Sequence, residues 1–403
     1  MGKALKGTGL LIYGILLSSI VAGISVLFLF LERIFSEFIW EELPAYLNWG
    51  NLYLLLICLI GGLLVGFGHK KWGALPRSAH DAMSELKQTK TLDYHVVLRS
   101  LVMALLILSF GAGVGPEAAL LGSVIALSVW QADKMRYYYF HYQELKQVSI
   151  LARVKRLSHP IQYLLTYDEE RAFLAGGQKK KKVLYGVFII NGLVTFTILM
   201  KMSGQPSFVS KMGTSNWGFN ELLLIFPFIG FGVLYGLGYH LLKKGMKKIF
   251  SFGKHRPIQM ALIGSAAIFL IAVYLPNLLF SGQLSLSLVP YVGMKESVIL
   301  LSIVALIKLI YLQVCLNTGW TGGDIFPVVF ASIIQGFAMA QLFPQYDTLL
   351  IVAIVSTSMS IVILKSPIVV GIFIALFFPL NLLPIILFIT CLFLVYQKVK
   401  TAK

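Results

Sequence analysis

Long runs of apolar residues dominate the chain, and short polar stretches separate them. A run of about twenty apolar residues is long enough to cross a bilayer as a helix. The first run, 9–31, is too long for the core of a signal peptide and no small-residue cleavage site follows it, so we expect a retained span. The runs predict helices at about 9–31, 51–68, 96–110, 115–130, 183–201, 220–242, 257–280, 297–317, 325–342, 347–364, 366–379 and 381–396.

Several of these runs are too short for an upright span, and several follow a glycine or a proline. In a membrane, broken backbone is tolerated only where it is buried in protein or lines a polar cavity. Short, interrupted helices whose ends meet at mid-depth are typical of an ion or solute site. Interfacial helices or ordinary kinked spans would give the same pattern. In either case the chain is expected to be an all-α polytopic membrane protein.

Composition agrees with this class, because 58% of the 403 residues are hydrophobic. The formal net charge of +17 would suggest a nucleic-acid partner in a soluble protein. Here we interpret the Lys and Arg residues as cytoplasmic loop charges and expect no nucleic acid. Lys3 and Lys6 near the start and "QKVKTAK" at the end predict that both termini are cytoplasmic and that the protein lies in the cell membrane.

No pattern of catalytic or metal-binding residues emerges. The three cysteines, Cys58, Cys315 and Cys391, lie in apolar runs without paired spacing, and the seven histidines are scattered. No phosphate-binding loop, zinc motif or nucleophile elbow occurs. We therefore expect no metal, no cofactor and no enzymatic activity.

The segment 131–182 departs from the rest, with eleven Lys or Arg and five Asp or Glu residues. Its middle, "QELKQVSILARVKRLSHPIQYLL", spaces apolar residues three and four apart, which suits an amphipathic helix on a membrane face. The run Lys179–Lys182 directly precedes an apolar run and favours the cytoplasmic side.

The stretch "GAGVGPEAALLG", Gly111 to Gly122, breaks the backbone between two apolar runs and then places a carboxylate, Glu117, among apolar residues. Pro116 favours the first turn of a helix, which should begin near Gly115. The first N–H groups of that helix need a partner, and an anion suits them. The glycines would let an anion approach the backbone closely.

A second break, "TGWTGGDIFPVVFASIIQG", has the same order of glycines, proline and apolar helix. A third and weaker one contains Ser78, which could cap a short helix or offer its hydroxyl to an anion. Three helix N-termini could therefore converge on one anion. The alternative is that the Gly-Pro breaks are kinks with packing roles.

These residues resemble the CLC family of chloride channels and chloride/proton antiporters. "GAGVGPEAALLG" is similar to its glutamate loop, in the "GPE" form of a divergent bacterial branch, and "GGDIFPVVFASIIQG" to its G-x-F-x-P loop. The C-terminal run, with Ser366-Pro367 before a short helix, and "LPNLLFSGQLS" at 275–285 also follow the family. The resemblance implies an inverted repeat with broken and re-entrant helices, and a homodimer.

The chain departs from the family pattern in three places. The position of the gating glutamate is Val114, which cannot ionise. The polar segment 131–182 stands where a helix with a second, proton-relay glutamate would lie, and the final helix with the central tyrosine is missing. Glu117 and Asp324 are the remaining gate or proton candidates. Otherwise Glu117 is a dipole partner or a buried hydrogen-bond acceptor, and Asp324 an N-cap.

The resemblance implies passive transport of small monovalent anions, chloride by default, without tight proton coupling. The expected anion site comprises Ser78, Val114, Gly115, Ile325 and Phe326. A carrier for another anion such as bicarbonate, or a degenerate member acting as a membrane binding or regulatory protein, remain alternatives. The expected parts are a first membrane half at 1–130, a basic cytoplasmic segment at 131–182, a span and loop at 183–219, and a second half at 220–403.

Overall fold

The computed structural model describes residues 2–170, 178–204, 211–253, 255–282, 285–287 and 289–402. These residues form helices and no β-strand, as the apolar runs predict. By length and composition, seven helical segments of the described residues can cross a membrane. They are Leu5–Leu47, Asn51–Trp72, Lys181–Met202, Phe219–Gly253, Pro257–Tyr274, Val298–Asn317 and Leu380–Lys400.

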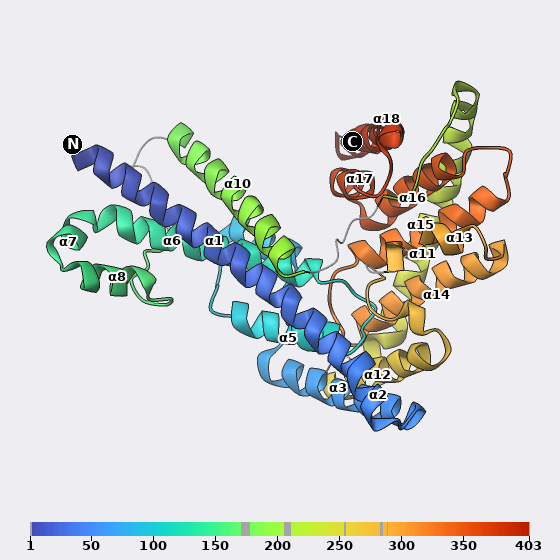
Figure 1. Ribbon diagram of the computed structural model, residues 1–403, viewed down its shortest axis with the longest axis horizontal. Helices are drawn as coiled ribbons and strands as arrows, with labels where there is room; N and C mark the ends of the chain where they lie inside the picture. Colours follow the sequence, from blue (N-terminus) through green and yellow to red (C-terminus); the bar gives the residue numbers. More distant parts are fainter. Residues whose placement is uncertain are drawn as a thin grey trace. The chain divides into compact units, whose positions relative to one another are not determined.

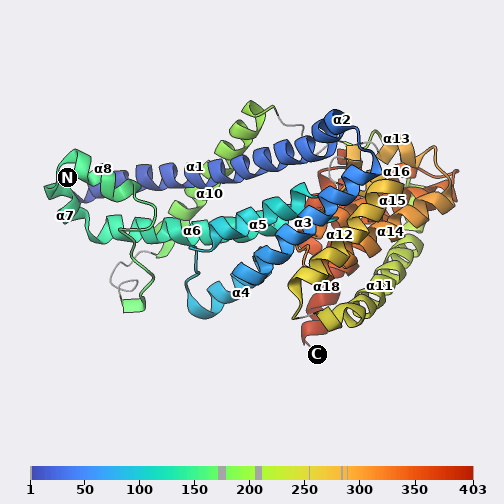
Figure 2. The same cartoon turned by 90° about the horizontal axis from the view of Figure 1, so that it is seen from below.

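The chain divides into two compact units, and each is described by itself. Unit 1 comprises residues 1–35, 76–105 and 118–205, and unit 2 comprises residues 36–75, 106–117 and 206–403. Figures 1 and 2 show the helices from two directions. The helices α1 (Gly2–Glu37), α5 (Val97–Ser109) and α6 (Glu117–Phe140) each have residues in both units.

Unit 1 is held together by two apolar clusters. One joins α1, α6, α7 and α10 through Tyr13, Leu17, Tyr138 and Phe188, among others. The other joins α4, α5 and α6. Its helices are α1 (Gly2–Glu37, first part), α4 (Ala79–Thr89), α5 (Val97–Ser109), α6 (Glu117–Phe140), α7 (Tyr142–Gln147), α8 (Ile150–Ser158) and α10 (Gln178–Met202).

Unit 2 contains the remaining helices. Its first elements are η1 (Phe38–Glu42), α2 (Leu43–Leu47) and α3 (Asn51–Trp72), and after residue 210 follow η2 (Phe219–Leu224), α11 (Ile225–Ile249), η3 (Phe250–Gly253), α12 (Pro257–Tyr274), η4 (Pro276–Leu278), η5 (Ser285–Ser287), α13 (Val289–Gly293), α14 (Val298–Asn317), α15 (Ile325–Gln341), α16 (Thr348–Leu364), α17 (Pro367–Ala375), η6 (Leu380–Leu382) and α18 (Leu383–Ala402).

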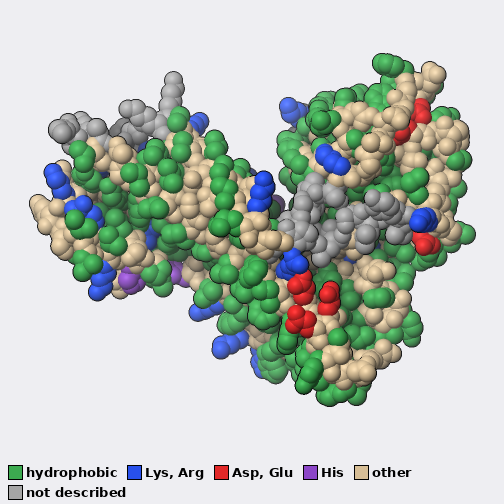
Figure 3. Space-filling model, in the orientation of Figure 1, with side chains coloured by type: hydrophobic (Ala, Val, Ile, Leu, Met, Phe, Trp, Pro, Cys, Tyr) green, Lys and Arg blue, Asp and Glu red, His purple; other side chains and the backbone are tan. Residues whose placement is uncertain are grey.

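Small residues allow the helices of unit 2 to approach closely. Gly62 of α3 faces Ser265 of α12, and Gly232 of α11 faces Ser358 of α16. Without a side chain at these positions each glycine backbone comes into contact with the neighbouring helix, which is typical of helix packing in membranes. Elsewhere large apolar side chains point outward, and hydrophobic side chains cover much of the visible face (Figure 3).

The short apolar helices α15 and α16 are the most buried elements of unit 2. Each has 17 residues, too few to cross a bilayer upright, and 14 of them are buried in each helix. Irregular backbone beside them is therefore enclosed by protein, as the membrane requires. The expectation of broken helices inside an all-α fold is confirmed.

Some predicted boundaries were wrong. The helix after the first break begins at Glu117 rather than Gly115 and continues to Phe140, so the boundary at residue 130 falls inside it. The expected amphipathic helix is split into α7 and α8 at Val148 and Ser149. Residues 171–177 of the basic segment, 205–210 of the following loop and 283–284 of the 275–285 loop lie outside the described part.

Candidate functional site

The two Gly-Pro breaks meet in unit 2. Gly115 donates its N–H to the carbonyl of Gly323 at 2.8 Å, and Gly323 donates to the carbonyl of Gly115 at 2.7 Å. This pair of hydrogen bonds forms an isolated antiparallel bridge. The N–H of Gly115 is thereby engaged, so the prediction that it is free for an anion was wrong.

Other contacts hold the first break against α14. The hydroxyl of Tyr311 donates to the carbonyl of Gly111 at 2.6 Å, and the N–H of Gly113 donates to Sγ of Cys315 at 3.4 Å. Val114 is fully buried and contacts the second break at Gly322. Because Val114 has no polar side-chain atom, it can line the site but cannot carry a proton there.

The second break is fixed to α3 and α12. The indole N–H of Trp320 donates to the carbonyl of Ala261 at 2.9 Å, and Trp320 is fully buried. A ring nitrogen of His69 lies 2.6 Å from the carbonyl of Gly319. Both breaks are therefore anchored by side chains from neighbouring helices, which leaves the N-terminus of α15 in a defined place.

The carboxylate of Glu117 lies on that N-terminus. Its Oε1 accepts hydrogen bonds from the N–H groups of Ile325 at 2.8 Å and Phe326 at 3.3 Å. These two groups are among the first four N–H groups of α15, which have no partner within the helix. The positive end of the helix dipole favours a negative charge there. Glu117 thus caps a helix far from it in sequence, rather than its own.

The second carboxylate oxygen of Glu117 is not engaged by these N–H groups. Among the described residues, its Oε2 is buried and has no hydrogen-bond partner. A buried carboxylate oxygen without a donor costs free energy, which a proton, a water or a change of position relieves. In this position only Oε1 of the carboxylate receives hydrogen bonds from the described residues.

Glycines make room for this carboxylate. A Cβ atom at Gly115 would overlap with Oε2 of Glu117, and one at Gly323 would overlap with the whole carboxyl group. The close approach that the sequence predicts for an anion is thus made by a side-chain carboxylate.

Asp324 precedes α15 and occupies its N-cap position, but its side chain makes no capping hydrogen bond. The expectation that Asp324 caps this helix with its side chain was wrong, because Glu117 takes the first two N–H groups instead. Asp324 is half-buried and remains a gate or proton candidate.

Ser78 belongs to unit 1, apart from the residues described so far. It is the N-cap of α4: its Oγ accepts the N–H of Asp81 at 3.2 Å and donates to the carboxylate of Asp81 at 2.7 Å. The capping alternative describes its geometry, and its role toward an anion stays a prediction.

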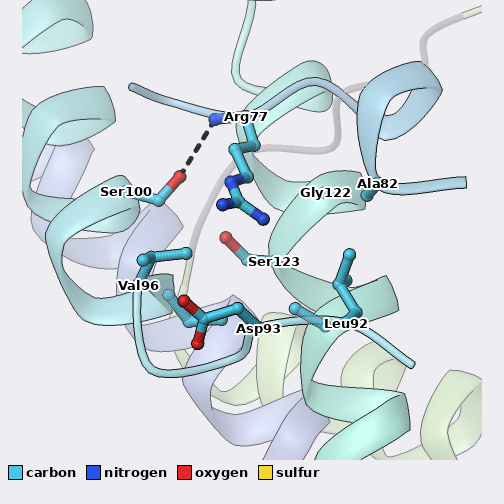
Figure 4. A pocket seen from close by; sticks show the side chains of 10 residues that line it. Arg77, Ala82, Leu92, Asp93, Val96, Ser100, Gly122 and Ser123 are labelled. Atoms are coloured by element: carbon cyan, nitrogen blue, oxygen red, sulfur yellow. Dashed lines mark hydrogen bonds between the residues drawn. The ribbon is translucent and has the colours of Figure 1, made fainter. Parts of the chain in front are cut away.

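A small cavity in unit 1 is lined by residues of α4, α5 and α6 and of the stretch between α4 and α5 (Figure 4). Arg77, Asp93, Ser100 and Ser123 line it, and the N–H of Arg77 donates to Oγ of Ser100 at 3.3 Å. The cavity volume is about 10 Å³, which is room for about one water molecule. Ser78 does not line this cavity, which is too small for a larger solute.

The fold has known counterparts. The chain superposes on a slow cyanobacterial Cl−/H+ antiporter with a TM-score of 0.70 and 15% identity, covering 95% of this chain and 92% of that one. The chain has the CLC fold. A CLC-type fluoride/proton antiporter matches with a TM-score of 0.61 and 16% identity over 96% of this chain and 94% of that one. No protein-family model and no curated protein matches the sequence.

The resemblance to the CLC family that the sequence predicts is confirmed at the level of the fold. The structure brings together Val114, Gly115, Glu117, Ile325 and Phe326. The sequence did not predict the hydrogen bonds between the two breaks. It also did not predict the contacts that Tyr311, Cys315 and His69 make with them. A buried tyrosine or cysteine in an apolar run gives no signal of the loop that it contacts.

Proposed function

We propose that this protein transports small monovalent anions, chloride first among them, across a membrane through a path that Glu117 gates. The observation that carries the proposal is that the Glu117 carboxylate accepts hydrogen bonds from the N–H groups of Ile325 and Phe326. Helix N-termini are ready-made anion sites, and a carboxylate there stands in for the transported ion.

Competition follows from this arrangement. While Glu117 is ionised, its Oε1 holds both N–H groups, and an anion must displace it. A proton on the carboxyl group weakens these hydrogen bonds, since bonds to a charged acceptor are roughly twice as strong as neutral ones. The released N–H groups then replace part of the hydration shell of an anion. Anion flux should therefore rise as the pH falls.

Passive conduction is the first candidate, because Val114 cannot ionise at the position of the family's gate. Proton-coupled exchange is the second candidate, and the position of the Glu117 carboxylate on the N-terminus of α15 favours it. A carboxylate that must take up a proton before it leaves the N–H groups can also carry that proton. The two solved structures named above are described as proton antiporters.

The test is anion efflux from liposomes that contain the purified protein, compared between the parent and Glu117→Gln at neutral and acidic pH. The neutral amide keeps the shape but loses the charge, so efflux at neutral pH should rise about fivefold to tenfold and no longer depend on pH. Asp324→Asn is the matched control and should keep the pH dependence. A parent whose efflux falls on acidification would contradict the gating role.

A further inference from the structure

The helix α8 in unit 1 exposes three large apolar side chains in one short stretch. Ile150, Leu151 and Val154 are 77%, 83% and 58% exposed. The helix has nine residues and carries Arg153, so it is too short and too polar to cross a bilayer. A contiguous exposed apolar group of this kind is typical of a surface that another phase or molecule covers.

The side of α8 that carries Ala152, Arg153, Arg156 and Leu157 is half-buried and attached to unit 1. Leu157 packs on the cluster of α1, α6, α7 and α10, and its carbonyl accepts the hydroxyl of Tyr13 at 2.9 Å. Nε of Arg153 donates to the carbonyl of Leu145 at 2.7 Å. These contacts fix the rotation of the helix about its axis. The apolar trio therefore points outward from unit 1 as part of the fold.

The charge along α7 and α8 is mostly positive. Together, α7 and α8 contain one acidic residue, Glu144, and four basic residues, which are Lys146, Arg153, Lys155 and Arg156. The helix α8 itself contains no acid. At the same end of unit 1 lie the start of α1 and the start of α10, where Lys181 and Lys182 stand (Figures 1 and 2).

We propose that α8 rests on the bilayer surface and that anionic phospholipid headgroups hold it there. Apolar side chains on one face with Lys and Arg at the rim match the boundary between acyl chains and headgroups. Each basic side chain near an anionic surface adds about 1 kcal/mol, or about fivefold in the equilibrium. The exposed Lys146 and Lys155 complement phosphate charge directly. This inference does not depend on the proposed transport.

The test is fluorescence quenching on the full-length protein in bilayers. A polarity-sensitive fluorophore is attached at Leu151→Cys, with the exposed native cysteine removed as Cys391→Ser. Bilayers are made with brominated phosphatidylcholine, either alone or with about a third of phosphatidylglycerol. We expect the ratio of quenched to unquenched label to be at least fivefold higher in bilayers with phosphatidylglycerol than in those without it. This difference should disappear at high salt.

Two variants separate the contributions. Lys155→Gln should lower the anionic-lipid effect about fivefold, whereas Lys244→Gln on α11, an exposed lysine elsewhere, should leave it unchanged. Ile150→Ser should lower quenching in both bilayers. Equal quenching with and without phosphatidylglycerol would overturn the proposal, and so would a label that only aqueous iodide reaches. If Leu151→Cys does not elute like the parent, Val154→Cys gives the same comparison.

Discussion

Gly115 and Gly323 exchange two backbone hydrogen bonds, with N···O distances of 2.8 and 2.7 Å. They come from breaks in opposite halves of the sequence, and the bridge places Glu117 on the N-terminus of α15. The geometry of the candidate site therefore depends on residues without side chains. The first prediction tests this dependence.

Gly115→Leu should reduce anion binding and flux at least tenfold. The new side chain would occupy the space of the Glu117 carboxylate, where an anion would have to enter. Loss of one hydrogen bond to a charge costs about 1.5–3 kcal/mol, and about 1.4 kcal/mol is one decade in affinity. Calorimetric titration with chloride and liposome efflux measure the two effects.

The matched control is Gly230→Ala on α11, because no atom lies near its additional methyl group. It should bind and transport like the parent. Gly122→Ala on α6 is unsuitable as a control, since its Cβ would collide with the carbonyl of Arg77. Unchanged anion binding in Gly115→Leu would mean that the break is only a packing kink.

If conduction is passive, a chloride gradient should not drive uphill proton movement into liposomes, since Val114 at the family's gating position cannot ionise. A pH-sensitive dye inside the vesicles reports the proton flux while a chloride electrode reports the anion flux. Proton uptake that disappears in Glu117→Gln but persists in Asp324→Asn would instead identify Glu117 as the proton carrier and favour exchange.

Lys308→Met should destabilise the protein. Lys308 is fully buried on α14, and its ammonium group donates to the carbonyls of Leu278, at 2.8 Å, and Phe280. The methionine keeps the volume but leaves two buried carbonyls without this donor, which costs about 2 kcal/mol or more. Thermal unfolding in detergent measures the loss.

Lys244→Met, at an exposed position of α11, is its control and should shift stability by about 0.5 kcal/mol at most. Equal melting temperatures for the parent and Lys308→Met would show that Lys308 does not stabilise the loop that contains Leu278 and Phe280.

Gln147→Cys on α7 should react with an impermeant thiol reagent only from the inside of the cell. The bias of Lys and Arg toward the cytoplasm predicts this side for the segment and for both termini. Tyr46→Cys, 86% exposed on α2 near the end of the first segment that can cross the membrane, should react only from outside. Both are made on a background without Cys391. Labels on reversed sides would invert the topology.

The sequence alone predicted the class of the fold and most of its helices. Apolar runs of sufficient length have few structures open to them in lipid, because each backbone polar group needs a partner within its own segment. For the same reason α15 and α16 were expected as short helices near the breaks, and their starts lie within one residue of the predicted positions. The two breaks also carried enough of the CLC pattern to predict the fold.

Only the tertiary structure decided what the carboxylates do. In the sequence, Glu117 stands at the start of its own helix and Asp324 at the start of α15, so local rules assign each to the nearer helix end. The structure pairs Gly115 with Gly323, and this contact brings Glu117 to Ile325 and leaves Asp324 without a capping bond. Hydrogen bonds between distant segments depend on how helices pack, and a local pattern of residues does not contain that information.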